Sequence, residues 1–175
     1  MRFTPSLLLI AVAACASGGG STTLSRGGDA MSTIGTRVTH NDVAKTTTLP
    51  FPIARVWQAL PFAFDSLAIP LTDLDPAKHM LGNGGMKVHK TLGSVDLSKY
   101  IDCGATQGFP SADTYDIFMK VVTEARPAEN GGTIVSTLVE ASGRPMAFPG
   151  SYTTCSTKET LENRIVELVT KRLAR

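Results

Sequence analysis

The sequence predicts an α+β fold of two layers, in which an antiparallel β-sheet is covered on one face by an N-terminal helix and a long C-terminal helix. Apolar residues recur at spacings of three and four after residue 52 and again after residue 156, which indicates two amphipathic helices. Between them, two segments alternate apolar and polar residues, as half-buried strands do. Each helix has one apolar side, and a sheet face is the partner that buries it.

The first predicted elements are a strand and a helix. Asn41–Leu49 is rich in threonine, and as a strand it places on one face Val43, Lys45, Thr47 and Leu49. Pro52 then opens a helix, a position where proline is tolerated. The apolar stripe of this helix consists of Ile53, Val56, Trp57, Leu60, Phe64 and Leu67. Pro61 lies within the stripe and lacks the N–H group that a helix interior uses, so we expect a kink or a break there.

The middle of the chain is predicted to hold a hairpin followed by a less regular stretch. Two short arms, Lys78–Leu81 and Met86–Lys90, flank Gly82–Gly85. The glycines and the asparagine of this segment accept the positive φ angles of a tight turn. Between residues 97 and 108, a short buried turn is expected from Leu97, Tyr100 and Ile101.

The clearest strand pattern lies in Thr114–Ala125 and Thr133–Ala141. The first of these segments places on one face Tyr115, Ile117, Met119 and Val121, and the second does the same with Val135, Thr137 and Val139. Pro127–Gly132 supplies a turn between them. The two segments are therefore predicted to pair as antiparallel strands.

The last predicted element is a helix that begins near residue 156. Ser156 and Glu159 have the spacing of a capping box, in which the serine hydroxyl and the glutamate carboxylate each accept a hydrogen bond from the other residue's amide. The apolar side of this helix consists of Leu161, Ile165, Leu168, Val169 and Leu173. Cationic side chains in its last turns suit the negative end of the helix dipole.

Length and charge limit the classes of function. The chain has 175 residues and a formal net charge of +2. Residues 38–175 are enough for a single globular α+β domain with a workable core. A balance of charge this close to neutral argues against a nucleic-acid partner bound by electrostatics.

The N-terminus carries an export motif. Arg2 precedes the apolar run Leu7–Ala11, and Val12-Ala13-Ala14-Cys15 follows it. This order of basic, apolar and small residues before a cysteine resembles the lipobox signal of the bacterial lipoprotein family. The resemblance implies that residues 1–14 are removed as a signal peptide. It also implies that the Cys15 sulfur receives diacylglycerol and that the new amino group is acylated, for example with palmitate.

A transmembrane anchor and an ordinary signal peptide are the alternatives for this segment. For the anchor, the apolar run is about half of the roughly 20 residues that a transmembrane helix needs. For the signal peptide, cleavage would occur at a small-x-small site such as Ala14-Cys15-Ala16, which would discard the cysteine and release the protein. The place of Cys15 within the first twenty positions favours lipidation, so Cys15 is our predicted attachment site.

Residues 15–37 are predicted to be a flexible tether. Gly, Ser and Thr dominate this segment, and it has almost no bulky apolar side chains. Such a composition cannot bury enough surface to offset the entropy of ordering. Ala16, rather than aspartate, follows the cysteine, and by analogy with the enterobacterial sorting rule this indicates the outer membrane, facing the periplasm. Membrane lipid, reached through acylated Cys15, is thus one expected partner.

The three cysteines fit this localisation. If Cys15 carries lipid, Cys103 and Cys155 remain as a pair in an oxidising compartment, where disulfides form and persist. A bridge between them would close a loop of about 50 residues and contribute up to about 4 kcal/mol in the chain-entropy model. The alternative is two separate buried thiols, because a free cysteine behaves as a small apolar residue.

The predicted order of elements resembles known helix-grip domains. A strand, a helix, several antiparallel strands and a long final helix are also found in START-like lipid-binding domains. The same order is found in the small domains of the lipoprotein component of the outer-membrane β-barrel assembly machinery. The resemblance is one of topology only, with no shared motif, so it implies a fold and transfers no functional residue.

Residues that carry catalysis are scarce. His40, His79 and His89 lack the spacing of a metal site, and on the predicted hairpin the last two point to opposite faces. Asp73 and Asp75 lie near His79 and would suit a cation, but aspartates in such a stretch are more often turn residues. The chain has no G-x-S-x-G motif and no phosphate loop. We therefore expect no catalytic residue, no metal and no cofactor.

The sequence favours binding over catalysis. Trp57, Phe64 and Tyr115 are candidates for lining a ligand cavity between helix and sheet, although at helical spacing the first two are more often plain core residues. The predicted function is that of a membrane-anchored envelope lipoprotein with a non-catalytic domain that binds an envelope protein partner. The alternative is a carrier or sensor of a small apolar ligand held in a helix-grip cavity.

Overall fold

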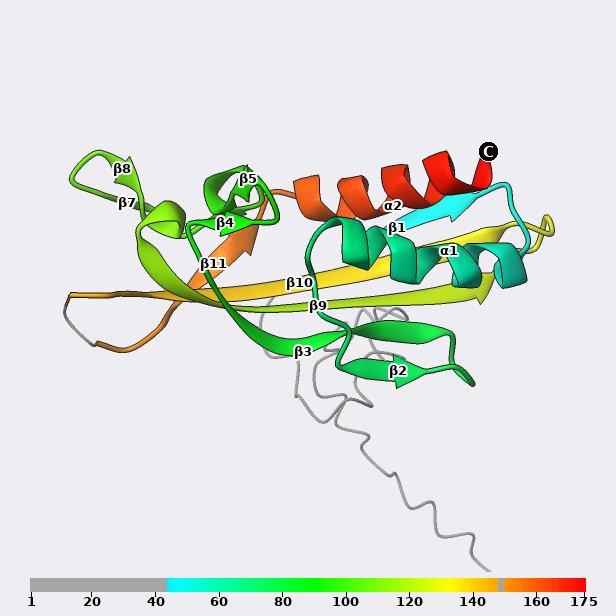
Figure 1. The fold of residues 1–175 in the computed structure, drawn as a ribbon, viewed down its shortest axis with the longest axis horizontal. Helices are drawn as coiled ribbons and strands as arrows, with labels where there is room; N and C mark the ends of the chain where they lie inside the picture. Colours follow the sequence, from blue (N-terminus) through cyan, green and yellow to red (C-terminus); the bar gives the residue numbers. More distant parts are fainter. Residues whose placement is uncertain (1–43, 148–149) are drawn as a thin grey trace, which may run out of the picture. The chain divides into compact units, whose positions relative to one another are not determined.

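A seven-stranded antiparallel sheet and two helices form the described part of this computed structural model, which comprises residues 44–147 and 150–175 (Figure 1). The sheet order is β2-β3-β9-β10-β11-β6, and β1 also pairs with β10. The predicted α+β class is confirmed. The signal peptide, Cys15, the tether and His40 lie outside the described residues. The strands of the sheet are β1 (Lys45–Leu49), β2 (Asp73–Asp75), β3 (Met80–His89), β6 (Ile101–Asp102), β9 (Tyr115–Pro127), β10 (Thr133–Pro145) and β11 (Thr153–Thr157).

The long strands β9 and β10 form the middle of the sheet. They pair without interruption from Thr133 opposite Pro127 to Pro145 opposite Tyr115, which confirms the predicted pair and extends it. The predicted apolar face of β9 is fully buried at Ile117, Met119 and Val121. Strand β1 begins at Lys45, and residues 41–43 of the predicted first strand lie outside the described part of the chain.

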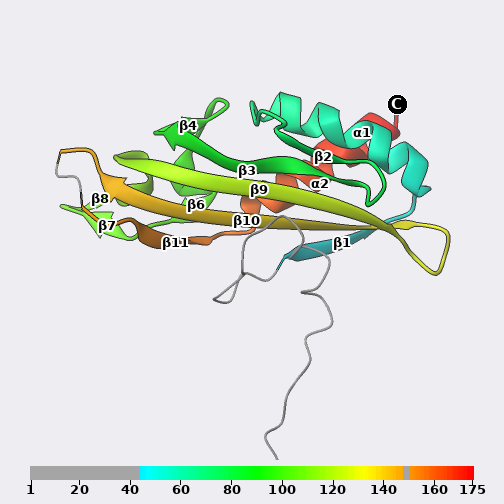
Figure 2. The same cartoon turned by 90° about the horizontal axis from the view of Figure 1, so that it is seen from below.

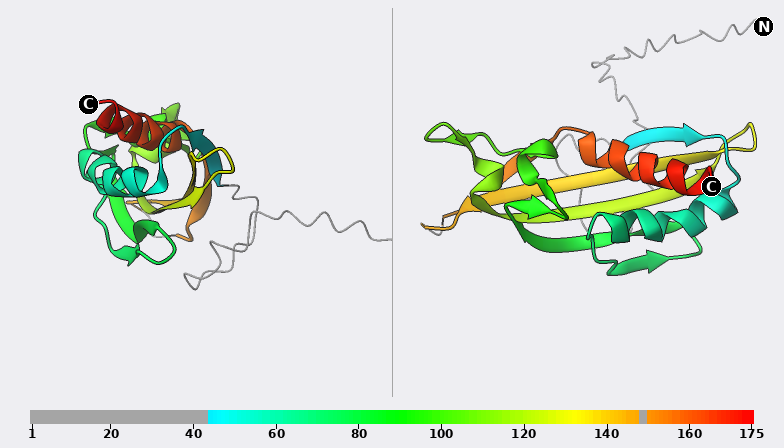
Figure 3. Two further views of the ribbon diagram at one scale, coloured as in Figure 1. Left: turned by 90° about the vertical axis from the view of Figure 1, so that its right-hand side faces the viewer. Right: turned by 45° about the horizontal axis from the view of Figure 1, so that its top comes forward.

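The two helices pack on one face of the sheet. Figure 3 shows the sheet curving around them when the molecule is viewed end-on. The helices are α1 (Ile53–Ser66) and α2 (Thr160–Leu173), and they lie side by side. Their buried stripes, at 0% exposure, include Val56, Leu60, Phe64, Leu161, Ile165 and Val169. The Arg55 guanidinium donates a hydrogen bond to the Leu173 carbonyl at 3.0 Å and so links the start of α1 to the end of α2.

Of the kink or break expected at Pro61, the break is absent, because α1 continues through this residue as one helix. Proline removes the hydrogen bond that residue 61 would otherwise donate to the Trp57 carbonyl, and this disfavours the helix. The residues on either side, Leu60 and Phe64, are fully buried against the sheet. Their burial stabilises the helical conformation on both sides of the proline, and tertiary packing therefore outweighs local propensity.

The predicted hairpin turn at Gly82–Gly85 is wrong. The chain turns earlier, before β3, where the Asp75 carboxylate accepts hydrogen bonds from two backbone amides and His79 has a φ of +49°. Strand β3 then continues through Gly82–Gly85 without a turn. Its register against β9 shifts between Asn83 and Met86, and such a shift is a β-bulge. These glycines therefore serve a bulge and a close approach of strands, which are their other common uses within a strand.

The predicted capping box at Ser156 is wrong as well. Ser156 belongs to β11 and lies opposite Asp102, and α2 begins only at Thr160. Glu159 is the N-cap residue, with a φ of +57° and no side-chain capping hydrogen bond. Thr157, and not Ser156, binds the Glu159 amide, because its hydroxyl accepts a hydrogen bond from that amide at 3.0 Å. The Glu159 carboxylate pairs with Lys45 at 2.5 Å.

A disulfide joins Cys103 to Cys155 and confirms the predicted pairing. It lies beside the short pairing of β6 with β11, which continues the sheet past β10 (Figure 2). The chain around it forms two small hairpins, β4–β5 (Thr91–Leu92 and Val95–Asp96) and β7–β8 (Ala105–Thr106 and Phe109–Pro110). Two short 3₁₀ helices, η2 (Leu97–Lys99) and η3 (Ser111–Asp113), complete it. The buried turn predicted at Leu97, Tyr100 and Ile101 is present.

Candidate functional site

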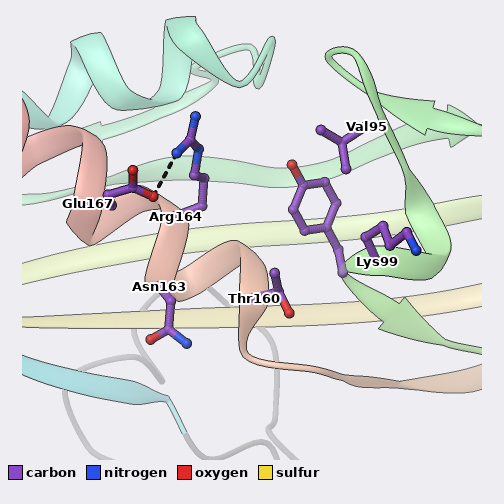
Figure 4. A pocket seen from close by; sticks show the side chains of 7 residues that line it. Val95, Lys99, Thr160, Asn163, Arg164 and Glu167 are labelled. Atoms are coloured by element: carbon purple, nitrogen blue, oxygen red, sulfur yellow. Dashed lines mark hydrogen bonds and ion pairs between the residues drawn. The ribbon is translucent and has the colours of Figure 1, made fainter.

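A groove beside α2 is the candidate functional site. It lies between the first turns of α2 and the segment that includes β5 and η2, and its volume is about 360 Å³ (Figure 4). We call it the α2 groove. Its lining residues are Val95, Lys99, Tyr100, Thr160, Asn163, Arg164 and Glu167.

The connection between β11 and α2 builds one wall of the α2 groove. The Lys158 amide donates a hydrogen bond to the Tyr100 carbonyl at 2.8 Å, and the Lys158 ammonium donates one to the Ser98 carbonyl at 2.8 Å. Both bonds hold η2 against the start of α2. The Cys103–Cys155 disulfide also joins these two segments, because Cys103 follows Tyr100 by three residues and Cys155 precedes Lys158 by three.

The charges of the α2 groove are mixed. Arg164 and Glu167 form an ion pair at 2.6 Å on the exposed side of α2, and Figure 4 shows both side chains together with Lys99 across the groove. Burial raises the pKa of the Tyr100 hydroxyl, and the Arg164 guanidinium opposes this only in part. Tyr100 is therefore a neutral hydrogen-bonding group at neutral pH.

The lining of the α2 groove combines apolar and polar surface. Its wall combines apolar surface from Val95 and the Tyr100 ring with amide, hydroxyl and charged groups from α2. Neither a histidine nor a cysteine lines it, and Tyr100 is held in the neutral form rather than activated. Such a lining suits a ligand or a peptide segment with both apolar and polar groups.

The structure separates the three residues predicted to line a cavity. Phe64 is fully buried in the core between α1 and the sheet. Trp57 is half-buried and contacts His79 edge-on, with ring centroids 5.5 Å apart. Tyr115 lies at the start of β9, where its hydroxyl is 2.9 Å from the Thr106 hydroxyl. None of the three lines the α2 groove.

The acidic cluster near β2 does not form a metal site. Within residues 44–147 and 150–175, no group of three or more potential ligand side chains is arranged to hold a metal ion. The Asp75 carboxylate caps the turn before β3, and the Asp73 carboxylate accepts a hydrogen bond from the Gly84 amide at 2.6 Å. His89 lies at the end of β3 opposite Asp116, and His79 lies in the turn just before the start of this strand.

A buried carboxylate lies on a different side of α2 from the groove. Glu162 is only 2% exposed and accepts a hydrogen bond from the Thr157 hydroxyl at 2.6 Å. Its second oxygen, Oε2, has no hydrogen-bond partner within the described part of the chain. Burial raises the pKa of Glu162, and the hydrogen bond from Thr157 lowers it by a smaller amount.

Three comparisons with known proteins found no match. No protein-family model, no curated protein and no solved structure matches the chain. Among the helices of the described residues, none has the length and apolar character needed to cross a membrane.

Proposed function

We propose that this chain is an exported lipoprotein, anchored to the outer membrane through Cys15, whose non-catalytic domain binds an envelope protein through the α2 groove. The lipobox residues Val12–Cys15 support the anchor. The Cys103–Cys155 disulfide supports an oxidising compartment, since such bridges are rare in reducing ones.

The observation that carries the binding function is the composition of the α2 groove. A wall of α2 presents Asn163, Arg164 and Glu167 to solvent, and η2 faces them with Lys99 and the partly apolar Tyr100. Exposed polar groups around an apolar floor are the arrangement found at specific interfaces.

The anchor is tested by mass spectrometry and by fractionation. Purified from its host, the protein is expected to start at Cys15 and to carry the mass of a diacylglycerol with an added acyl chain. The Cys15→Ala variant is expected to leave the membrane fraction. A product that retains Met1, or one that lacks lipid, contradicts this part of the proposal.

The α2 groove is tested by photo-crosslinking in intact cells. A photo-reactive amino acid at Asn163 is expected to give a discrete crosslinked protein. The same amino acid at Lys171, which is exposed on the last turn of α2 outside the groove, serves as the matched control. Equal crosslinking from both positions, or none from Asn163, contradicts a partner site in the groove.

A small apolar ligand is the second candidate function. The volume of the α2 groove lies within the range of about 300–1,000 Å³ that is typical of small-molecule sites. The space between α2 and the sheet is instead occupied by side chains such as Ile165 and Val169, which are fully buried. A ligand would therefore use the groove. Native mass spectrometry of protein purified without detergent tests this by the presence of a bound small molecule.

A further inference from the structure

Three large apolar side chains are exposed in two loops of the domain. Phe109, in the β7–β8 hairpin, is 66% exposed. Met146, which follows β10, is 58% exposed, and Tyr152, which precedes β11, is 41% exposed. We call these three residues the loop-tip cluster. An exposed phenylalanine and an exposed methionine on neighbouring loops are a common sign of an interaction surface.

The two loops lie at the same end of the domain. The Thr106 hydroxyl, in the β7–β8 hairpin, is 2.9 Å from the Tyr115 hydroxyl, and Tyr115 pairs directly with Pro145 at the end of β10. Figures 1 and 2 show the β7–β8 hairpin at the same end of the sheet as the last residues of β10 and the first residues of β11. The cluster therefore faces outward from one end of the sheet.

The shape of the cluster favours a lipid surface over a protein. A specific protein interface buries about 1,200–2,000 Å² in total, and three separate side chains on protruding loops offer far less than that. Insertion into a bilayer interface needs no such complementary surface. The Arg144 guanidinium lies 5.0 Å from the centre of the Tyr152 ring. An arginine beside a tyrosine is typical of residues that lie at the level of lipid headgroups.

We propose that the loop-tip cluster inserts into the headgroup region of a phospholipid bilayer, with Phe109 and Met146 entering the acyl boundary and Tyr152 and Arg144 lying at the headgroups. This contact is separate from acylation of Cys15.

Tryptophan fluorescence tests the insertion directly. The experiment uses the full chain with Cys15→Ala, which removes the acyl anchor, and with Trp57→Phe, which removes the only tryptophan. Phe109→Trp then places a reporter in the cluster. Phosphatidylcholine vesicles, with and without added phosphatidylglycerol, are expected to shift its emission to the blue, and brominated lipid is expected to quench it.

Leu74→Trp in the same background is the matched control. The exposed fraction of Leu74, 63%, is similar to that of Phe109. Leu74 lies on β2, away from the end of the sheet that carries the β7–β8 hairpin (Figure 2). Any binding through the N-terminal apolar run is common to both proteins. Equal or absent quenching of the two reporters overturns the proposal.

Co-sedimentation with the same vesicles supplies a second measurement. Replacing Phe109 and Met146 together by serine is expected to weaken vesicle binding by about tenfold or more, since each apolar side chain contributes to the transfer. Leu74→Ser is expected to leave binding unchanged. If the double variant changes the oligomeric state in solution and leaves vesicle binding intact, the cluster joins two copies of the chain and the lipid proposal is overturned. None of these results depends on the state of Cys15.

Discussion

Glu162 places a carboxylate where water hardly reaches it. One carboxylate oxygen accepts a hydrogen bond from the Thr157 hydroxyl, and the other has no hydrogen-bond partner among the residues that the structure describes. Burial without full pairing disfavours the charged form, which is why the pKa of this group is raised. Of the nearby charges, Glu159 raises the pKa further and Lys45 lowers it. The folded protein consequently holds this proton more tightly than the unfolded chain does.

The raised pKa makes stability depend on pH at this residue. The stabilising contribution of protonated Glu162 is fully present below the ordinary pKa of 4.5 and is lost as the pH rises through the folded-state value. Glu162→Gln keeps the shape and an oxygen for Thr157 but does not titrate. The variant is therefore expected to gain stability relative to the wild type as the pH rises from acid to neutral.

Denaturant unfolding at a series of pH values measures this gain. It is expected to amount to about 1.4 kcal/mol for each tenfold difference in proton affinity between the folded and unfolded states. Glu167→Gln is the control, because that carboxylate is 60% exposed in its pair with Arg164 and such pairs contribute little. A stability difference for Glu162→Gln that does not vary with pH would contradict the burial of a charge at this position.

At the scale of elements, the close approach of β3 to β9 depends on Gly82. A Cβ atom at this position would lie 2.3 Å from the Val121 carbonyl oxygen and 2.7 Å from the Val122 Cα. Both are backbone atoms of β9, so they cannot move aside without disturbing the strand. Gly82→Ala is expected to lower the free energy of unfolding by about 2 kcal/mol or more, as overpacking in a core does. Thermal or denaturant unfolding measures this loss.

Gly84→Ala is the matched control within the same segment. A Cβ atom there would meet Asp73 Oδ2 at 2.9 Å, which is the end of a side chain that is able to rotate away. Its effect is expected to be clearly smaller than that of Gly82→Ala. If the two variants are equally tolerated, the segment is a turn, as the sequence pattern alone indicates, and not part of β3.

The helices and long strands were predictable from the sequence, whereas the turns, the bulge and the start of α2 were not. The stripes of α1 and α2 and the alternation of β9 and β10 reflect burial on one face, which leaves a pattern over many residues. The glycines at 82–85 suit a turn and a bulge equally well, and only pairing with β9 decides between them. Ser156 and Glu159 likewise suit either a capping box or a strand that precedes the helix. Pairing of Ser156 with Asp102 decides for the strand.

The candidate site was less predictable than the fold. Tyr100 was expected to be buried, but nothing in the sequence associates it with Asn163 or Arg164, more than sixty positions away. Lys158, just before α2, links the two segments. Its backbone amide donates a hydrogen bond to the Tyr100 carbonyl and its ammonium donates one to the Ser98 carbonyl, and both are tertiary contacts. Cys103 and Cys155 were the available signal, since their pairing brings together the two segments that flank the groove.

At the scale of the whole molecule, the disulfide fastens the segment around β6 to the rest of the sheet. Apart from it, β6 is held to β11 by a pairing of only two residues on each strand. The bridge closes a sequence separation of 52 residues. The Cys103→Ala, Cys155→Ala double variant is expected to lose about 4 kcal/mol of unfolding free energy by the chain-entropy estimate.

Guanidinium unfolding with and without a thiol reductant checks this value. The reductant is expected to destabilise the wild type by a similar amount and to leave the double variant unchanged, which is the internal control. Crosslinking from Asn163 is expected to fall in the double variant, because η2 is then held mainly by Lys158. A wild type that is indifferent to the reductant would show that the bridge contributes nothing to stability.

The position of β1 has a mechanical consequence. A tension that reaches the domain through the preceding chain acts first on Lys45, which pairs with Thr137 in the sheet and with Glu159 at the start of α2. The load is shared at once between two parts of the domain. The five residue pairs of β1 with β10 and the ion pair of Lys45 with Glu159 must separate before the force reaches α1. Detachment of β1 is thus the first event that we expect under such a pull.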